Sequence, residues 1–170
     1  MPNLILTVIG PDRPGLVRAL AQAVANQGGS WLESRMARLG GQFAGIVRIE
    51  APETILGELH HLEQHGLRVT AEPVEPAAPP VGERLMLEVT GNDRPGIVRD
   101  VTRVLSENAI NIEELTTNVE AASFTGGTLF RAIAILRAPN HVAVEAAQSG
   151  LEQLGNELMV DVKPAPEEAG

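Results

Sequence analysis

An internal repeat constrains the fold of this chain more than any other feature. Residues 8–18 match residues 89–99 at an offset of 81, and eight of the eleven positions are identical. The match keeps glycine and proline in fixed places, which a shared composition alone does not produce. We therefore expect two copies of one folding unit in tandem.

The copies differ in length after the first helix. Phe43 and Ala51 correspond to Phe130 and Ala138 at an offset of 87, so the second copy carries about six extra residues near 121–127. A proline-rich stretch between the copies is typical of a stiff, extended linker. The predicted organisation is a first domain (1–73), a linker (74–83), a second domain (84–163) and a disordered tail (164–170).

Each copy shows the same order of periodic segments. Apolar alternation predicts strands, and apolar residues at helical spacing predict helices. In copy one these are strand 4–8, a helix from residue 16 to Gly28, strands 30–39 and 42–51, helix 54–65 and strand 67–72. In copy two they are strand 85–89, a helix around 97–105, strands 111–119 and 128–137, helix 141–154 and strand 157–162.

The order βαββαβ, taken twice, is typical of the ferredoxin-like plait. This is an α+β fold with an antiparallel sheet and both helices on one face. One copy of this size leaves a sheet face or edge bare. We therefore expect the two halves to pack against each other, side by side or face to face, and the chain to form a homo-oligomer.

Composition excludes several classes of function. The chain has no cysteine, which rules out disulfides, thiolate metal sites and cysteine nucleophiles. Its net charge is −9 and only 2% of its residues are aromatic, which argues against direct nucleic-acid binding. No apolar run approaches the roughly 18 residues of a membrane span. The sequence predicts a cytoplasmic protein that binds neither nucleic acid nor membrane.

The repeated Asp-Arg-Pro-Gly segment lies where the first strand ends and the first helix begins. We expect its aspartate to cap the helix, its proline to be the first helical residue and its glycine the second. A glycine there is poor for helicity but lets a ligand reach the backbone. The amides of a helix start attract a carboxylate. A ligand site and a well-made helix start are both consistent with this pattern.

This segment, with Leu-Val or Ile-Val after it and Asn-Ile opening the next strand of copy two, resembles the ACT domain. The resemblance covers about 150 of the 170 residues. It implies a βαββαβ fold that binds small effectors, commonly amino acids, at interfaces between paired domains. The implied ligand-binding residues are Asp12, Arg13, Pro14, Gly15, Ser30, Asp93, Arg94, Pro95, Gly96, Asn111 and Ile112. Copy one has Ser30 in place of Asn111, so we expect the stronger site in copy two.

Other polar residues do not form a catalytic pattern. His61 and His65 are four residues apart, with Glu58 nearby, and we interpret them as a solvated helix face instead of a metal site. No serine lies in a nucleophile elbow. Gly126-Gly127 lacks the lysine of a phosphate-binding loop and is read as a hairpin tip. We expect no enzyme activity, no metal and no cofactor.

These observations leave three hypotheses for the function. The first is a regulatory protein that binds a small amino acid, glycine or a similar one, and acts on a partner regulatory protein. The second is a dimerisation module without a ligand. The third is a regulatory subunit of an amino-acid or folate enzyme. Ligand-dependent stabilisation separates the first from the second.

Overall fold

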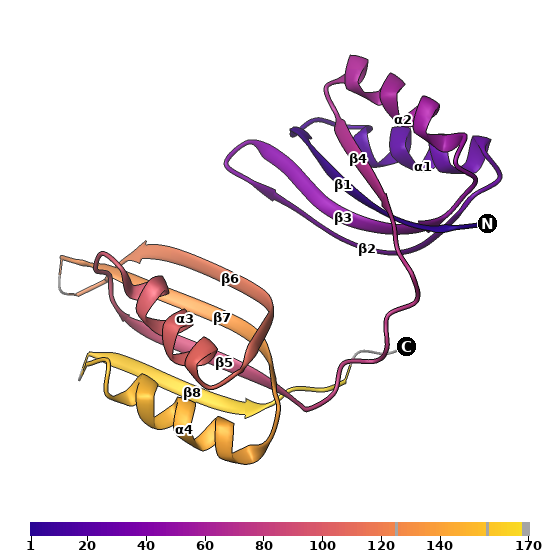
Figure 1. Ribbon diagram of the computed structural model, residues 1–170. Coiled ribbons are helices and arrows are strands. Elements are labelled where there is room, and N and C mark those ends of the chain that lie inside the picture. Colours follow the sequence, from indigo (N-terminus) through magenta and orange to yellow (C-terminus); the bar gives the residue numbers. More distant parts are fainter. Residues whose placement is uncertain (125, 156, 168–170) are drawn as a thin grey trace. The chain divides into compact units, whose positions relative to one another are not determined.

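The computed structural model describes residues 1–124, 126–155 and 157–167 and divides into two compact units, Met1–Ala78 and Pro79–Gly170 (Figure 1). Unit 1 contains β1 (Asn3–Pro11), α1 (Leu16–Asn26), β2 (Ser30–Leu39), β3 (Gln42–Glu50), α2 (Ile55–Leu62), a 3₁₀ turn (Glu63–His65) and β4 (Arg68–Pro73). Unit 2 contains β5 (Glu83–Asn92), α3 (Ile97–Glu107), β6 (Asn111–Ala121), β7 (Thr128–Ala138), α4 (His141–Glu152) and β8 (Leu158–Pro164). The predicted order βαββαβ is confirmed in both units.

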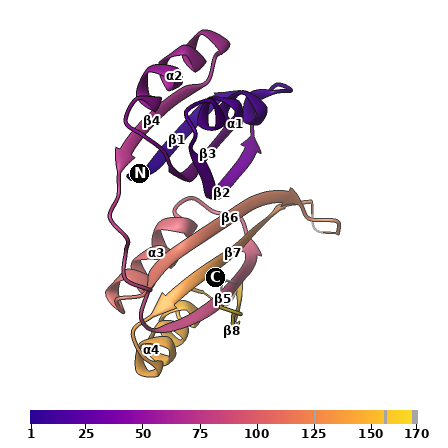
Figure 2. The same cartoon turned by 90° about the vertical axis from the view of Figure 1, so that its right-hand side faces the viewer.

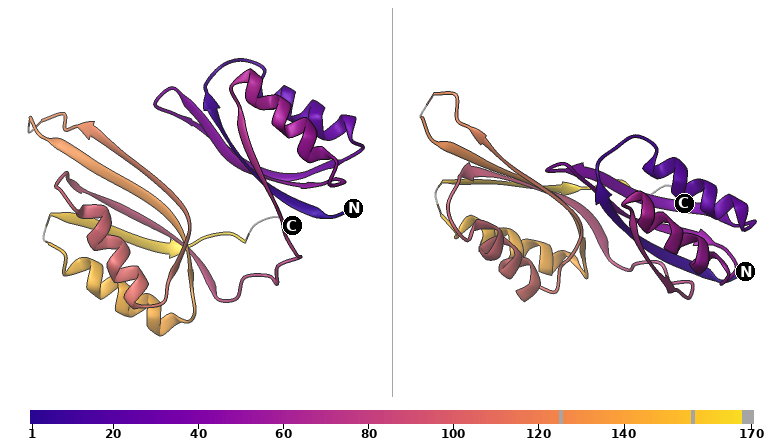
Figure 3. Two further views of the ribbon diagram at one scale, coloured as in Figure 1. Left: turned by 45° about the horizontal axis from the view of Figure 1, so that its top comes forward. Right: turned by 90° about the horizontal axis from the view of Figure 1, so that it is seen from above.

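Each unit has one four-stranded antiparallel sheet with both helices on one face (Figure 3). The strand orders are β2-β3-β1-β4 and β6-β7-β5-β8. The edge strand next to β7 is therefore β6 (Figure 2). This arrangement confirms the α+β, ferredoxin-like fold class.

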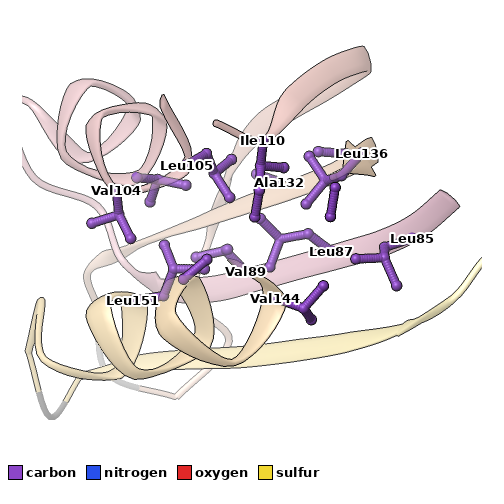
Figure 4. Close-up of a cluster of buried hydrophobic side chains, with 14 of the residues drawn as sticks. Leu85, Leu87, Val89, Val104, Leu105, Ile110, Ala132, Leu136, Val144 and Leu151 are labelled. Carbon is purple, nitrogen blue, oxygen red and sulfur yellow. The ribbon is translucent and has the colours of Figure 1, made fainter. Parts of the chain in front are cut away.

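The core of unit 2 lies between the sheet and its two helices. Alternate residues of β5, namely Leu85, Leu87 and Val89, point toward Leu105 of α3 and Leu151 of α4 (Figure 4). Each of these five side chains is at most 5% exposed. Full burial of such a side chain contributes about 1.5–3 kcal/mol. The aliphatic core therefore replaces the aromatic residues that the chain lacks.

The last strand, β8, ends two residues beyond the predicted strand 157–162. Pro164 is the last residue of β8, so the strand includes the first residue of the segment predicted to be a disordered tail. Residues 168–170 of that segment lie outside the described residues. Within the described part of the chain, no helix is long and apolar enough to span a membrane.

Candidate functional site: the two Asp-Arg-Pro-Gly turns

The backbone of both turns is set by a glycine in the left-handed region. Gly15 precedes α1 with φ 92°, and Gly96 precedes α3 with φ 81°. Residues with a Cβ rarely adopt this conformation, so the glycine has a backbone role. The prediction that Pro14 and Pro95 begin the helices is wrong, because each left-handed glycine separates the proline from the first helical turn.

The aspartates of the turns do not cap the helices. Neither helix receives a side-chain capping bond. The backbone amide of Asp12 donates to the Gly41 carbonyl at 2.9 Å, and that of Asp93 donates to the Thr128 carbonyl at 3.0 Å. The predicted capping role is therefore wrong: each aspartate lies three residues before the capping position and instead ties the turn to the neighbouring hairpin. Arg38 strengthens this tie in unit 1 with an ion pair to Asp12 at 3.5 Å.

An open pocket of about 360 Å³ lies beside the turn of unit 1. The turn and α1 contribute one wall, and the 3₁₀ turn after α2 contributes the other; the lining residues are Arg13, Pro14, Gly15, Leu16, Ala19, Gln64 and His65. Among the described residues, Arg13 has no carboxylate partner and no side-chain hydrogen bond. A free guanidinium beside the uncapped start of a helix is suited to a small carboxylate.

The turn of unit 2 is closed by an ion-pair network. Arg94 Nη1 donates to Asp100 Oδ2 at 2.9 Å, and Arg99 Nη2 donates to Asp100 Oδ1 at 3.0 Å. The hydrogen bonds from Arg94 and then Arg99 hold the pKa of Asp100 below its usual value. A Cβ placed on Gly96 would meet Arg99 Nη2 at 3.0 Å, so this guanidinium lies over the backbone that a ligand would approach.

The difference between the two turns comes from one position of the repeat. Unit 1 has Ala19 where unit 2 has Asp100, at the same offset of 81. Arg94 is thus neutralised within its own unit, whereas Arg13 is not. These contacts favour unit 1 as the carboxylate site, the reverse of the ranking expected from sequence. Ligand binding at either turn stays a prediction.

The remaining predicted site residues lie at the other end of each sheet. Asn111 pairs with Arg137, which pairs with Arg84 near the start of β5, whereas Asp93 follows Asn92 at its end. Eight residues of strand separate Arg84 from Asn92, about 26 Å at 3.3 Å per residue. One unit therefore does not bring Asn111 and Gly96 to the same small ligand, contrary to the sequence-based prediction.

Ser30 and Ile112 occupy the same end of their sheets as Asn111. Ser30 pairs with Glu50, which pairs with Asn3 at the start of β1. Ile112 packs against the core of unit 2 and is half-buried. Neither residue lies beside the turn of its own unit.

Unit 2 contains a small apolar cavity between α3 and the sheet. Its volume is about 20 Å³, and Val98, Val101 and Ile112 are among its lining residues. This is room for about one water-sized group and is too small for an amino acid. At the equivalent positions of β2, the larger Trp31 and Met36 pack against the core of unit 1. The size difference at these repeat positions is visible in the sequence.

The histidines of unit 1 lie on α2 and on the 3₁₀ turn that follows it. Within 1–124, 126–155 and 157–167, no three His, Asp or Glu side chains gather closely enough to hold a metal ion. His65 instead lines the pocket beside Arg13. Sequence spacing grouped it with His61 and gave no indication of this contact.

Comparison with known proteins identifies the domains. Residues 3–71 and residues 85–149 each match the ACT domain. The proteins named glycine cleavage system transcriptional repressor from Escherichia coli (strain K12) and Shigella flexneri are 28% identical to this chain over 129 residues. The match covers 70% of this chain and 66% of theirs, so this chain spans about two thirds of the length of these relatives.

Solved structures share the fold over nearly the whole chain. The crystal structure of an unknown protein from Galdieria sulphuraria has a TM-score of 0.82 at 30% identity and covers 97% of this chain and 99% of its own. The crystal structure of a protein described as a glycine cleavage system transcriptional repressor has a TM-score of 0.69 at 17% identity, covering 96% and 98%. At that identity the second likeness shows the fold alone.

Proposed function

The chain belongs to the ACT domain family, with two domains in tandem, and we propose that it is a non-catalytic regulatory protein that senses a small amino acid. The domains are residues 1–73 and 84–163, joined by the linker 74–83. We take the ligand to be glycine or a similar amino acid and the target to be a partner protein that regulates glycine cleavage genes. The names of the Escherichia coli and Shigella flexneri relatives support this target.

The pocket beside Arg13 is the observation that carries the proposal. An amino acid would place its carboxylate between the Arg13 guanidinium and the free amides at the start of α1. The side-chain carbonyl of Gln64, on the opposite wall, is an acceptor for the ammonium group. The pocket is open, which suits a ligand that binds reversibly and is shared with a partner surface.

A second copy of the chain would bring the separated site residues together. Ten of the eleven residues of the edge strand β6 are exposed. Antiparallel pairing of two such strands places the start of one beside the end of the other. The end of β6 lies at the same end of the sheet as Asp93, since Ala121 pairs with Thr128 and Asp93 bonds to Thr128. Asn111 of one copy would then approach the turn that contains Asp93 in unit 2 of the other copy.

The exposed β6 strand also favours a second candidate, a dimerisation module without a ligand. A long strand with unpaired backbone groups binds another strand without any small molecule. The two candidates differ in one measurable property. A sensor is stabilised by its amino acid. A dimerisation module without a ligand is stabilised only when the protein concentration is raised, because this favours the dimer.

The deciding experiment is a thermal unfolding screen of the full chain against the twenty amino acids. A ligand at 100 times its dissociation constant raises the free energy of unfolding by about 2.7 kcal/mol. We expect such a shift with one or a few small amino acids. A flat response across all twenty, with an unfolding midpoint that rises with protein concentration, would favour the dimerisation module.

A further inference from the structure

Two buried arginines lie side by side on the face of the unit 2 sheet that carries no helix. Arg84 of β5 and Arg137 of β7 are direct partners in the ladder, and each side chain is only 9% exposed. Their sequence neighbours Leu85 and Leu136 point into the core, so the arginines point to the opposite face. Two buried like charges need compensating carboxylates.

The first compensating carboxylate belongs to a bulge in β6. The register of the β6–β7 ladder shifts between Ile112 and Glu114, which leaves Glu113 as the extra residue. Glu113 Oε1 lies 3.5 Å from Arg84 Nε and 3.3 Å from Arg137 Nη2. One carboxylate is thus shared by two guanidiniums.

The second carboxylate comes from the chain after β8, residues 165–167, which we call the C-terminal strap. The strap continues beside the start of β5 (Figure 1). The Ala165 amide donates to the Arg84 carbonyl at 3.0 Å, and Arg84 Nη1 donates to the Pro166 carbonyl. Arg137 Nη1 donates to Glu167 Oε1 at 3.2 Å. The Glu167 side chain is 71% exposed, so it sits at the entrance to a buried guanidinium.

Arg137 retains unused hydrogen-bonding capacity. Its Nε is buried and has no acceptor among the described residues. Burial acts to lower the pKa of Arg137, but hydrogen bonds and charge from Glu167 and Glu113 outweigh it and raise that pKa above its usual value. The guanidinium is therefore charged, and the described carboxylates beside it are those of Glu113 and of Glu167 in the strap.

The first unit shows that the fold does not require this arginine pair. Asn3 and Glu50 occupy the equivalent positions and are partners in the β1–β3 ladder. Leu32 occupies the bulge position of Glu113. The pair is thus a property of unit 2 and calls for a separate explanation.

We propose that Arg84 and Arg137 form an oxyanion-binding site, and that Glu167 of the C-terminal strap is its built-in occupant. A free carboxylate or phosphate competes with the strap, because it supplies the same negative charge and several acceptor oxygens for the planar guanidinium forks. Binding of the free oxyanion releases the strap from the start of β5. The site is separate from the Arg13 pocket and does not depend on the function proposed above.

The first test removes the built-in occupant. The full chain carrying Glu167→Gln and Glu168→Gln, the second being its acidic neighbour in sequence, is titrated with inorganic phosphate and with malonate at constant ionic strength. Without the Glu167 carboxylate as a competitor, the variant should bind the oxyanion saturably, with a dissociation constant at least about fivefold lower than that of the wild type. The probe that binds more tightly identifies the ligand class, phosphate or carboxylate. The control carries Glu53→Gln and Glu63→Gln, an equal charge change at exposed positions of unit 1.

Two results would overturn the proposal. One is an equal oxyanion response in the strap variant and the unit 1 control, which would indicate general charge screening. The other is a response that survives when Arg137→Gln is added to the strap variant. Because Arg137 is buried, that triple variant must first show native-like circular dichroism.

The second test uses the wild-type chain and so does not depend on a variant that folds. Phosphate should speed hydrogen exchange of the Ala165 amide several-fold, since this amide bonds to Arg84 only while the strap is docked. The Asp93 amide, bonded to Thr128 at the other end of the sheet, is the internal control and should not change. Equal acceleration of both amides, or of neither, contradicts strap release.

Discussion

Asp100 Oδ2 lies 2.9 Å from Arg94 Nη1 in unit 2, whereas Ala19 stands at the same repeat position in unit 1. One substitution between the copies thus decides whether the arginine of the Asp-Arg-Pro-Gly turn is neutralised within its own unit. The repeat makes each unit a control for the other, since the glycine before the helix is left-handed in both. We therefore predict that mutation at this position exchanges the ligand properties of the two turns.

Ala19→Asp should weaken amino-acid binding in unit 1. The new carboxylate would pair with Arg13 as Asp100 pairs with Arg94, and would repel the ligand carboxylate. Loss of one charge-assisted bond costs about 1.5–3 kcal/mol, so affinity should fall at least about tenfold. Calorimetric titration with the amino acid found in the thermal screen measures this. Ala21→Asp, an equal change at an exposed position of α1, should bind normally; equal loss in both variants would remove Arg13 from the site.

Asp100→Ala should make the turn of unit 2 able to bind. The substitution frees Arg94 and also releases Arg99, whose guanidinium lies over Gly96. We expect the number of amino-acid sites per chain to rise from one to two in a calorimetric titration. Asp161→Ala, which also removes one carboxylate from unit 2, is the comparison. If the stoichiometry of Asp100→Ala stays at one, closure by the ion pair is not what distinguishes the two turns.

The same ion pair predicts a defined pH dependence of stability. The pKa of Asp100 is lowered by Arg94 and then by Arg99. A carboxyl with a lowered folded pKa stabilises the native state above its unfolded pKa of about 3.9, and this stabilisation is lost as pH falls through the folded value. The difference in free energy of unfolding between wild type and Asp100→Asn should be constant from pH 7 to 5. It should then shrink as the pH falls below about 4.

Urea unfolding at pH 7, 5, 4 and 3 measures this difference. Asp12→Asn serves as the comparison, because among the described residues the Asp12 carboxylate forms a single ion pair, with Arg38 at 3.5 Å. A difference for Asp100→Asn that persists unchanged to pH 3 would show that the ion pair does not stabilise the fold through its charge.

The order of elements could be predicted because periodicity and repetition support each other. Strands and helices alternate apolar and polar residues at different periods, and the repeat supplies every pattern twice. The separation of Asn111 from Gly96 was also accessible from the topology. A helix that follows a strand returns along the sheet, so the next strand begins at the opposite end from the turn.

The contacts at the turns were less accessible from sequence. A glycine is compatible with several backbone conformations, so the left-handed state of Gly15 could not be distinguished from a second helical position. The difference between Ala19 and Asp100 is visible in the repeat, but the partner of Asp100 depends on side-chain geometry. The pairing of Arg84 with Arg137 depends on the register of β5 against β7, two strands that are far apart in the sequence.

The left-handed conformation of Gly15 predicts opposite effects for two glycine substitutions in unit 1. Gly15→Ala should lower the free energy of unfolding by about 1–2 kcal/mol, because a Cβ disfavours positive φ. A Cβ at Gly15 meets no atom within 4 Å, so the cost is conformational and not steric. Gly57→Ala, inside α2 and equally free of contacts, should raise stability by about 0.5–1 kcal/mol. Urea unfolding distinguishes the signs, and a neutral Gly15→Ala would mean that the helix begins at Pro14 after all.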